Sequence, residues 1–299
     1  AHNGGVTGGA SDFSYMPDAG IGYSLLFNSD DFQNMRKVME LVRDFQTQSL
    51  EPPEKTPAVS LEVAHHEIEG LYYPINSRQQ ISYFLDRVLG ARRLKIIDNM
   101  LDVKPVLDSE SDIYYPVADN LYAAEETGVS MLSSVVDPLV GDVVHIGTLV
   151  YKPSSAALVY GQLAIGALWL LSIASSLVYF LVWGVRRWRG KINPGPTIRI
   201  RQWPLLAGVS IIAVVATFMS AMSDPIGYLS EPNLITLTIF GGSIAFAVFA
   251  VLGVSTAINA RHTPMNRVNY WYSTIMSFTH LVVAAYFTWF GVIGLMTWA

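Results

Sequence analysis

The sequence contains no cysteine and is poor in charged residues. Without cysteine the chain forms no disulfide and offers no thiolate to a metal ion, while either redox compartment stays open. Only 14% of the 299 residues are charged and 51% are hydrophobic, which is too apolar for an ordinary soluble enzyme. The composition therefore predicts that part of the chain lies in a membrane.

Acidic residues are nearly absent from the second half of the chain. Residues 1–152 hold 22 Asp and Glu against 11 Lys and Arg, whereas residues 153–299 hold 2 against 8. The acidic first half argues against nucleic acid as a partner, because a phosphate backbone attracts basic surfaces. The chain thus divides into a polar, acidic half and an apolar, basic half.

Long apolar runs without Asp, Glu, Lys or Arg fill the second half. A helix crosses a bilayer in about 20 residues, and Trp or Tyr lies near several ends of these runs, as at membrane interfaces. The sequence predicts an α-helical membrane domain over 153–299 with four transmembrane helices, at Ala156–Val185, Trp203–Met222, Leu234–Asn259 and Trp271–Trp298. Small residues in the third run, such as Gly241, Gly242 and Gly253, predict close packing between helices.

The loops between these runs differ in their basic residues. The first loop carries six between Arg186 and Arg201, the second carries none, and the third carries Arg261 and Arg267. By the positive-inside rule the first and third loops are cytoplasmic. We therefore expect a multi-pass protein of a bacterial-type inner (plasma) membrane, with the lipid bilayer as a partner and with the polar half and the C-terminus extracytoplasmic.

Residues 1–50 have the pattern of a β-hairpin followed by a helix. The β-rich runs at Phe13–Met16 and Gly22–Phe27 flank "PDAG", whose Pro, Asp and Gly favour a tight turn. Apolar residues at helical spacing then predict a helix over Asp31–Gln48. The proline-containing stretch 51–57 predicts a linker.

Residues 58–152 predict a small, mostly antiparallel β domain. Short runs rich in Val, Ile and Tyr, such as "DIYYPV" and "VVHIGTLVY", alternate with breaks made of Asp, Asn, Gly and Pro. A helix precedes these runs, with Ser77 as its cap and Gly90 as its end.

The histidines favour structural roles. His65, His66 and Glu67 are adjacent, so their side chains point apart, and no second cluster accompanies them to complete a metal site. His280 lies in the last apolar run without a charged intramembrane partner, and we expect a neutral imidazole that is hydrogen-bonded to a neighbouring helix rather than a proton relay. No metal and no cofactor are expected.

The opening stretch "HNGGVTGGASDFSYMPDAGIGYSLLFN" resembles the C-terminal conserved block of the serine β-lactamase and penicillin-binding-protein-like hydrolases, in the branch of class C β-lactamases and esterase-like peptidases. In that family a Lys-Thr-Gly or His-Thr-Gly triplet lies on an inner strand beside the active site, followed by a glycine turn, two strands and a closing helix. Here His2, Asn3 and Gly4 form the triplet, with Asn3 in place of Thr. A one-residue shift would put Asn3 at the Lys position, but His2 keeps a cationic or hydrogen-bonding group there.

The resemblance implies acyl-enzyme chemistry on a small amide or ester, with D-amino-acid peptides and β-lactams among the substrates. The family's nucleophile comes from a Ser-x-x-Lys helix turn. Neither Ser-x-x-Lys nor Tyr-x-Asn occurs in these residues. The catalytic Ser, Lys and Tyr are therefore expected in a missing upstream hydrolase segment, which makes the chain the C-terminal part of a hydrolase and not a complete enzyme.

Taken together, these features predict an α+β fragment. It comprises the terminal hairpin and helix of a β-lactamase-like domain (1–50), a linker (51–57), a small β-rich extracytoplasmic domain (58–152) and a four-helix transmembrane domain (153–299). The predicted function is the C-terminal part of a membrane-anchored, exported serine hydrolase.

Two alternative functions stay open. One is a non-catalytic extracytoplasmic binding or regulatory module on a membrane anchor. The other is a small transporter or signalling membrane protein with an extracytoplasmic cap. The absence of charge from the apolar runs counts against an ion or proton transporter.

Overall fold

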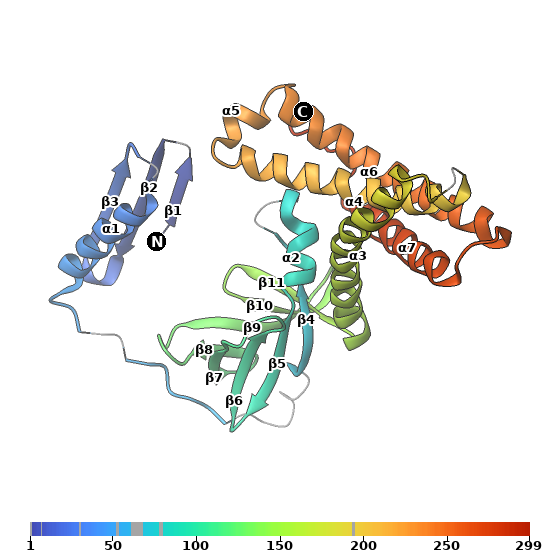
Figure 1. The fold of residues 1–299 in the computed structure, drawn as a ribbon. Helices are drawn as coiled ribbons and strands as arrows, with labels where there is room; N and C mark the ends of the chain where they lie inside the picture. Colours follow the sequence, from blue (N-terminus) through green and yellow to red (C-terminus); the bar gives the residue numbers. More distant parts are fainter. Residues whose placement is uncertain are drawn as a thin grey trace. The chain divides into compact units, whose positions relative to one another are not determined.

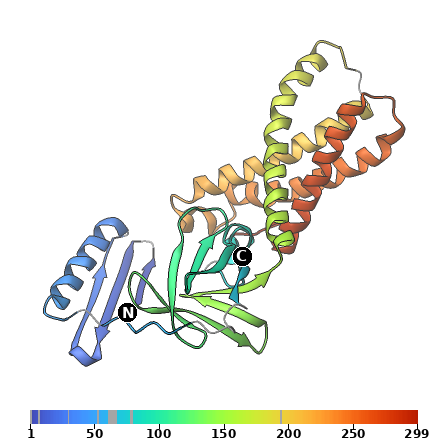
Figure 2. The same cartoon turned by 90° about the horizontal axis from the view of Figure 1, so that it is seen from below.

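The computed structural model describes residues 2–6, 8–29, 31–51, 54–60, 68–77, 80–192 and 195–299. The chain separates into two compact units, Ala1–Glu54 and Lys55–Ala299. Figures 1 and 2 show the helices and strands of both units.

The first unit is a three-stranded antiparallel sheet with one helix. Its strands pair in the order β1 (His2–Val6), β2 (Gly9–Met16) and β3 (Ile21–Phe27), and its helix is α1 (Phe32–Thr47). A 3-10 turn joins β2 to β3 and ends at Gly20, whose φ of 63° favours glycine. Asp31 begins α1, because its carboxylate accepts a hydrogen bond from the amide of Asn34 at 3.2 Å. The hairpin and the helix form where the sequence predicts them.

The sheet of the first unit has a covered face and an open face. Asn3 pairs with Asp12 across β1 and β2, so both side chains lie on one face. Arg43 of α1 reaches Asp12 on this face, and α1 therefore covers it (Figure 1). The opposite face, called the open face below, carries exposed apolar side chains, namely Val6, Phe13, Tyr15 and Leu26.

The second unit begins with a closed, antiparallel, eight-stranded barrel. Its strands in chain order are β4 (Gly70–Pro74), β5 (Arg92–Ile97), β6 (Met100–Pro105), β7 (Asp112–Ala118), β8 (Leu121–Ala124), β9 (Ser130–Asp137), β10 (Gly141–Ile146) and β11 (Leu149–Ser154). Each strand pairs with the next one, and β11 closes the ring against β4, with Tyr151 opposite Pro74. The helix α2 (Tyr83–Leu89) lies between β4 and β5 in the sequence and ends at Gly90.

Side chains fill the barrel. An eight-stranded barrel encloses a space just wide enough for its inward-facing side chains. Leu94, Leu101, Val103 and Tyr122 are almost completely buried in this core. Asp98 and Asn99 take positive φ angles of 49° and 64° in the two-residue turn between β5 and β6, as a type I′ hairpin requires.

Closure of the barrel makes the predicted fold class wrong. The predicted β runs do form strands, but β4 is not among them, and "VVHIGTLVY" divides at Gly147 into β10 and β11. Because the ring closes through pairing of β4 with β11, the dominant β structure is a barrel. An α+β fragment with a small β-rich accessory domain does not describe the chain.

A helix bundle follows the barrel (Figures 1 and 2). Its helices are α3 (Ala156–Trp188), α4 (Pro196–Ala221), α5 (Pro225–Leu229), α6 (Leu234–Asn259) and α7 (Arg267–Trp289). Among the described residues, three helices are long and apolar enough to cross a membrane, namely Ala156–Trp188, Pro196–Ala221 and Leu234–His262.

The prediction of four transmembrane helices is therefore wrong, and the fourth is the one that fails. Polar side chains such as Asn269, Thr274 and His280 interrupt the apolar sequence of α7. The helix ends at Trp289 instead of Trp298, and Gly291 beyond it takes a left-handed φ of 71°. α7 instead packs against α6 and α3 inside the bundle.

Small residues bring the bundle helices close together as predicted at Gly242 and Gly253, but not at Gly241, where an added Cβ atom would meet nothing within 4 Å. A Cβ atom at Gly242 of α6 would lie only 2.7 Å from the side chain of Val214 in α4. A Cβ atom at Gly253 would lie 2.9 Å from the hydroxyl of Ser277 in α7. His280 is fully buried, with its ring 5.9 Å from that of Phe246 in α6. Within the described residues neither of its ring nitrogens has a hydrogen-bond partner, so the expected hydrogen bond to a neighbouring helix does not form.

Candidate functional site

The three predicted site residues lie together on β1. His2, Asn3 and Gly4 are all exposed and pair with Phe13, Asp12 and Ser11 of β2. The rings of His2 and Phe13 stack with their centroids 5.9 Å apart. His2 therefore lies on the open face.

Asn3 lies on the opposite face of the sheet from His2. Consecutive side chains along a strand point to opposite faces, and Asn3 faces the side that α1 covers, with its cross-strand neighbour Asp12. The register thus separates two candidates that the sequence left next to each other. A group brought against the open face meets His2 and not Asn3.

Gly4 leaves the open face bare beside His2. A Cβ atom at this position would touch only the hydroxyl of Ser11, at 3.6 Å, which is an ordinary contact distance. The packing within the unit therefore does not require glycine here. The missing side chain instead lets another group approach the backbone of β1.

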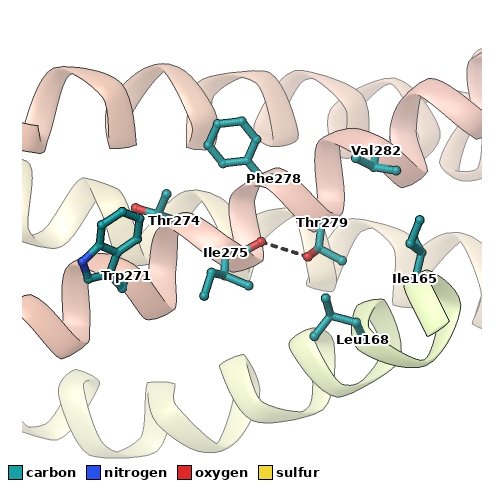
Figure 3. Close-up of a pocket in the computed structure, with 8 residues that line it drawn as sticks. All are labelled: Ile165, Leu168, Trp271, Thr274, Ile275, Phe278, Thr279 and Val282. Carbon is teal, nitrogen blue, oxygen red and sulfur yellow. Dashed lines mark hydrogen bonds between the residues drawn. The ribbon is translucent and has the colours of Figure 1, made fainter. Parts of the chain in front are cut away.

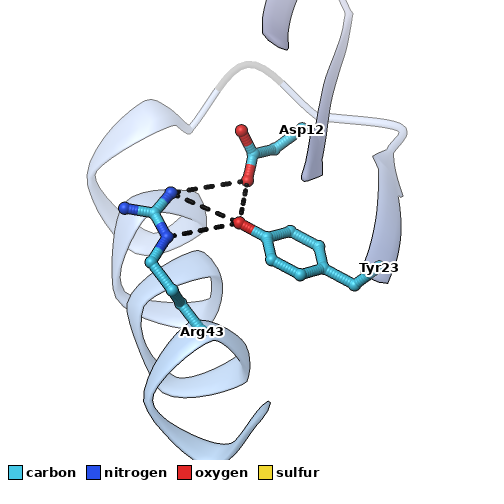
Figure 4. Close-up of polar contacts among 3 residues, drawn as sticks. All are labelled: Asp12, Tyr23 and Arg43. Atoms are coloured by element: carbon cyan, nitrogen blue, oxygen red, sulfur yellow. Dashed lines mark hydrogen bonds and ion pairs between the residues drawn. The ribbon is translucent and has the colours of Figure 1, made fainter. Parts of the chain in front are cut away.

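A polar cluster joins the covered face to α1 (Figure 4). The side chain of Asp12 is 4% exposed, and one of its oxygens accepts a 2.7 Å hydrogen bond from the hydroxyl of Tyr23. Arg43 donates two hydrogen bonds of 3.3 Å to the same hydroxyl and lies 3.7 Å from the Asp12 carboxylate. The hydrogen bond to Tyr23 raises the pKa of Arg43. We call Asp12, Tyr23 and Arg43 the clamp.

The clamp was not among the predicted site residues. A signal for it exists in the sequence, since Asp12 interrupts a β run and Arg43 follows the inward-facing Val42 on α1. The position of Asp12 under α1 explains why its charge is paired, because burying an unpaired carboxylate is costly. The clamp fixes α1 on the sheet and thereby leaves the opposite face as the one that presents His2.

Metal ligation has no candidate in the described residues, where no group of three or more His, Cys, Asp or Glu side chains gathers. His65, His66 and Glu67 lie outside the described residues. Comparison of the chain with protein-family models, with curated proteins and with solved structures finds no match in any of the three.

Proposed function

We propose that the first unit is the closing part of the catalytic domain of a serine hydrolase that works through an acyl-enzyme, and that the bundle fixes this hydrolase in a membrane. One observation carries the proposal. His2, the first residue of the triplet, lies on the open face beside Phe13, whereas α1 covers the other face.

The open face supports the presence of a second layer in the complete domain. Val6 and Leu26 are 74% and 82% exposed, and Phe13 is exposed beside them. Burial of each such side chain stabilises a fold by about 1.5–3 kcal/mol, so a sheet with a bare apolar face gains from a covering layer. In the proposed domain that layer carries the catalytic Ser and Lys. The sequence itself contains no Ser-x-x-Lys motif.

The proposed chemistry gives His2 a role toward the substrate. The serine oxygen attacks the carbonyl carbon of an amide or ester, and the amine or alcohol leaves with a proton, so that an acyl-enzyme remains. An imidazole on the open face donates a hydrogen bond to a substrate carboxylate or to the group that carries the nucleophile's proton. A D-amino-acid peptide or a β-lactam fits this chemistry, and so does a simple ester.

The proposed location is a bacterial-type inner membrane, with the barrel extracytoplasmic. The basic loops that follow α3 and α6 support this sidedness. A reporter fusion at Ile226, in the segment between α4 and α6, is expected to report outside, and a cytoplasmic signal there would contradict the sidedness.

The test of the hydrolase proposal begins with the coding sequence upstream of Ala1, which should encode a Ser-x-x-Lys helix. The extended protein is then treated with a fluorescent β-lactam and with an activated ester, and the rate of acylation is measured. His2→Ala should slow acylation roughly a hundredfold, since loss of one such group costs about 2–4 kcal/mol of transition-state stabilisation. Asn3→Ala is the matched control on the covered face.

Three outcomes would overturn the proposal. The upstream sequence could lack Ser-x-x-Lys, which would favour a non-catalytic binding module. The rate of acylation could be the same in His2→Ala as in the parent protein. Equal losses of acylation and of melting temperature in His2→Ala would assign His2 a purely structural role.

A further inference from the structure

The helix α2 is attached to the bundle through aromatic residues. The ring of Phe84 lies 5.3 Å from that of Phe287 in α7, in an edge-on arrangement, and the ring of Tyr83 lies 5.6 Å from that of Phe290. The hydrogen bond from Tyr286 to the carbonyl of Phe84 adds a polar link. These contacts place α2 beside the end of α7, and α2 also packs against α3.

Apolar side chains of α2 are also exposed. Leu85 and Leu89 lie one turn apart on α2 and are 47% and 52% exposed. Together with Phe84 and Val88 they line one side of a groove in the bundle. The bilayer around α3 is an apolar environment that is available to them.

An apolar groove runs between α3 and α7. One section, of about 460 Å³, lies under α2 and includes Gly166, Trp169 and Phe287 in its lining. The next section, of about 360 Å³, is shown in Figure 3. Ile165 and Val282 line both sections, so the two sections adjoin.

The lining of the second section is almost entirely apolar. Figure 3 shows aliphatic and aromatic side chains of α3 and α7 around it, with Thr274 and Thr279 as the polar residues. Thr279 satisfies its hydroxyl within α7, by donating to the carbonyl of Ile275 at 2.9 Å. Such a surface offers little to a sugar, a peptide or an ion.

The dimensions of the groove suit a slender occupant. Its lining extends along α7 from Trp271 to Phe287, which spans about 24 Å at the rise of an α-helix. This length is close to the roughly 30 Å of a bilayer's hydrocarbon core. An acyl chain is long, thin and apolar enough to lie along this groove.

We propose that the groove between α3 and α7 binds one acyl chain of a membrane phospholipid, with α2 lying over the chain near the membrane surface. The helix α3 is long and apolar enough to cross the membrane, so the groove opens on the lipid that surrounds it. The proposal concerns the second unit alone and is independent of the hydrolase function.

Two glycines of α3 provide a matched pair of variants. Gly166 lines the section under α2, and an added Cβ atom there would meet nothing within 4 Å. A Cβ atom at Gly161, five residues earlier, would also meet nothing within 4 Å, but Gly161 is not among the residues that line the groove. Gly166→Phe therefore fills the groove, whereas Gly161→Phe adds the same ring outside it.

The first measurement counts bound phospholipid. The full chain and both variants are extracted from membranes in mild detergent, and the phospholipid retained per chain is counted by native mass spectrometry. The parent protein and Gly161→Phe should retain one phospholipid per chain. Gly166→Phe should retain at most about a tenth of that amount. Equal retention by the two variants would overturn the proposal.

A second measurement uses the unmodified protein and so does not depend on a variant that folds. The protein is reconstituted in phosphatidylcholine and phosphatidylglycerol vesicles that contain a phospholipid with a photoreactive acyl chain. Cross-links should form mainly at Leu168 and Phe278 in the groove. They should be rarer at Val215 and Val251, which are exposed on α4 and α6. Uniform labelling would indicate surrounding lipid only, and cross-links between two copies of the chain would indicate a protein occupant; either result overturns the proposal.

Discussion

Removal of the Tyr23 hydroxyl should loosen α1 from the sheet of the first unit. In Tyr23→Phe the buried carboxylate of Asp12 loses its 2.7 Å hydrogen bond and keeps only Arg43, at 3.7 Å. A hydrogen bond to a charged group contributes about 1.5–3 kcal/mol, whereas a half-exposed ion pair contributes at most about 1 kcal/mol. The ion pair with Arg43 therefore does not compensate for the lost hydrogen bond. The free energy of local opening should fall by about 1.5–3 kcal/mol.

Hydrogen exchange measured by mass spectrometry on the full chain checks this expectation. A loss of about 1.5–3 kcal/mol corresponds to roughly 10- to 150-fold faster exchange in the peptides of β2, β3 and α1. Tyr15→Phe is the matched control, because Tyr15 lies on the open face and is 64% exposed. Exchange in Tyr23→Phe within twofold of that in Tyr15→Phe would refute the role of the clamp.

Two further predictions concern the second unit. Burial raises the pKa of Tyr122 to about 12, above the value of about 10 in an unfolded chain. The stability that neutral Tyr122 gives the barrel is therefore fully present below about pH 10. It is lost as the pH rises through about 12. In Tyr122→Phe, the protection of barrel amides should fall less between pH 9 and pH 11 than in the parent, and an equal fall would contradict this. Gly242→Val should lower the melting temperature in detergent by several degrees, because its Cβ atom would lie 2.7 Å from Val214, whereas Gly241→Val, whose Cβ atom meets nothing within 4 Å, should change it little. Equal changes of melting temperature in Gly242→Val and Gly241→Val would show that the close contact of α4 and α6 does not determine the stability of the bundle.

Local elements of this fold could be predicted from the sequence, but the closure of the barrel could not. The hairpin depends on neighbouring residues such as Pro17 and Gly20, and the strands of the barrel depend on runs of β-branched and aromatic residues. The pairing of β4 with β11 joins Pro74 to Tyr151, and no short-range pattern records such a distant contact. The error in the last apolar run has a different cause. A run without charge predicts a span, but the hydroxyl groups of its Ser and Thr residues and the imidazole of His280 lower its apolarity.

The candidate site could be predicted in part. The pattern around His2, Asn3 and Gly4 gives their place on a strand, but only the register with β2 shows that His2 and Asn3 face opposite sides. The clamp depends on three residues spread over 31 positions and on the packing of α1, so it emerges from tertiary structure. The groove between α3 and α7 likewise depends on how the two helices pack and has no signature in either helix alone.

Closure of the barrel has a consequence for how copies of this protein behave when they meet. An open sheet presents a row of unpaired N–H and C=O groups, to which a strand of another molecule can add. Proteins held in a membrane diffuse in two dimensions and collide often, so an open edge beside the bilayer would be a persistent template for aggregation. In the barrel, β4 and β11 satisfy each other's backbone groups, and the ring has no edge to offer. Neighbouring copies can therefore crowd together without their barrel strands exchanging partners.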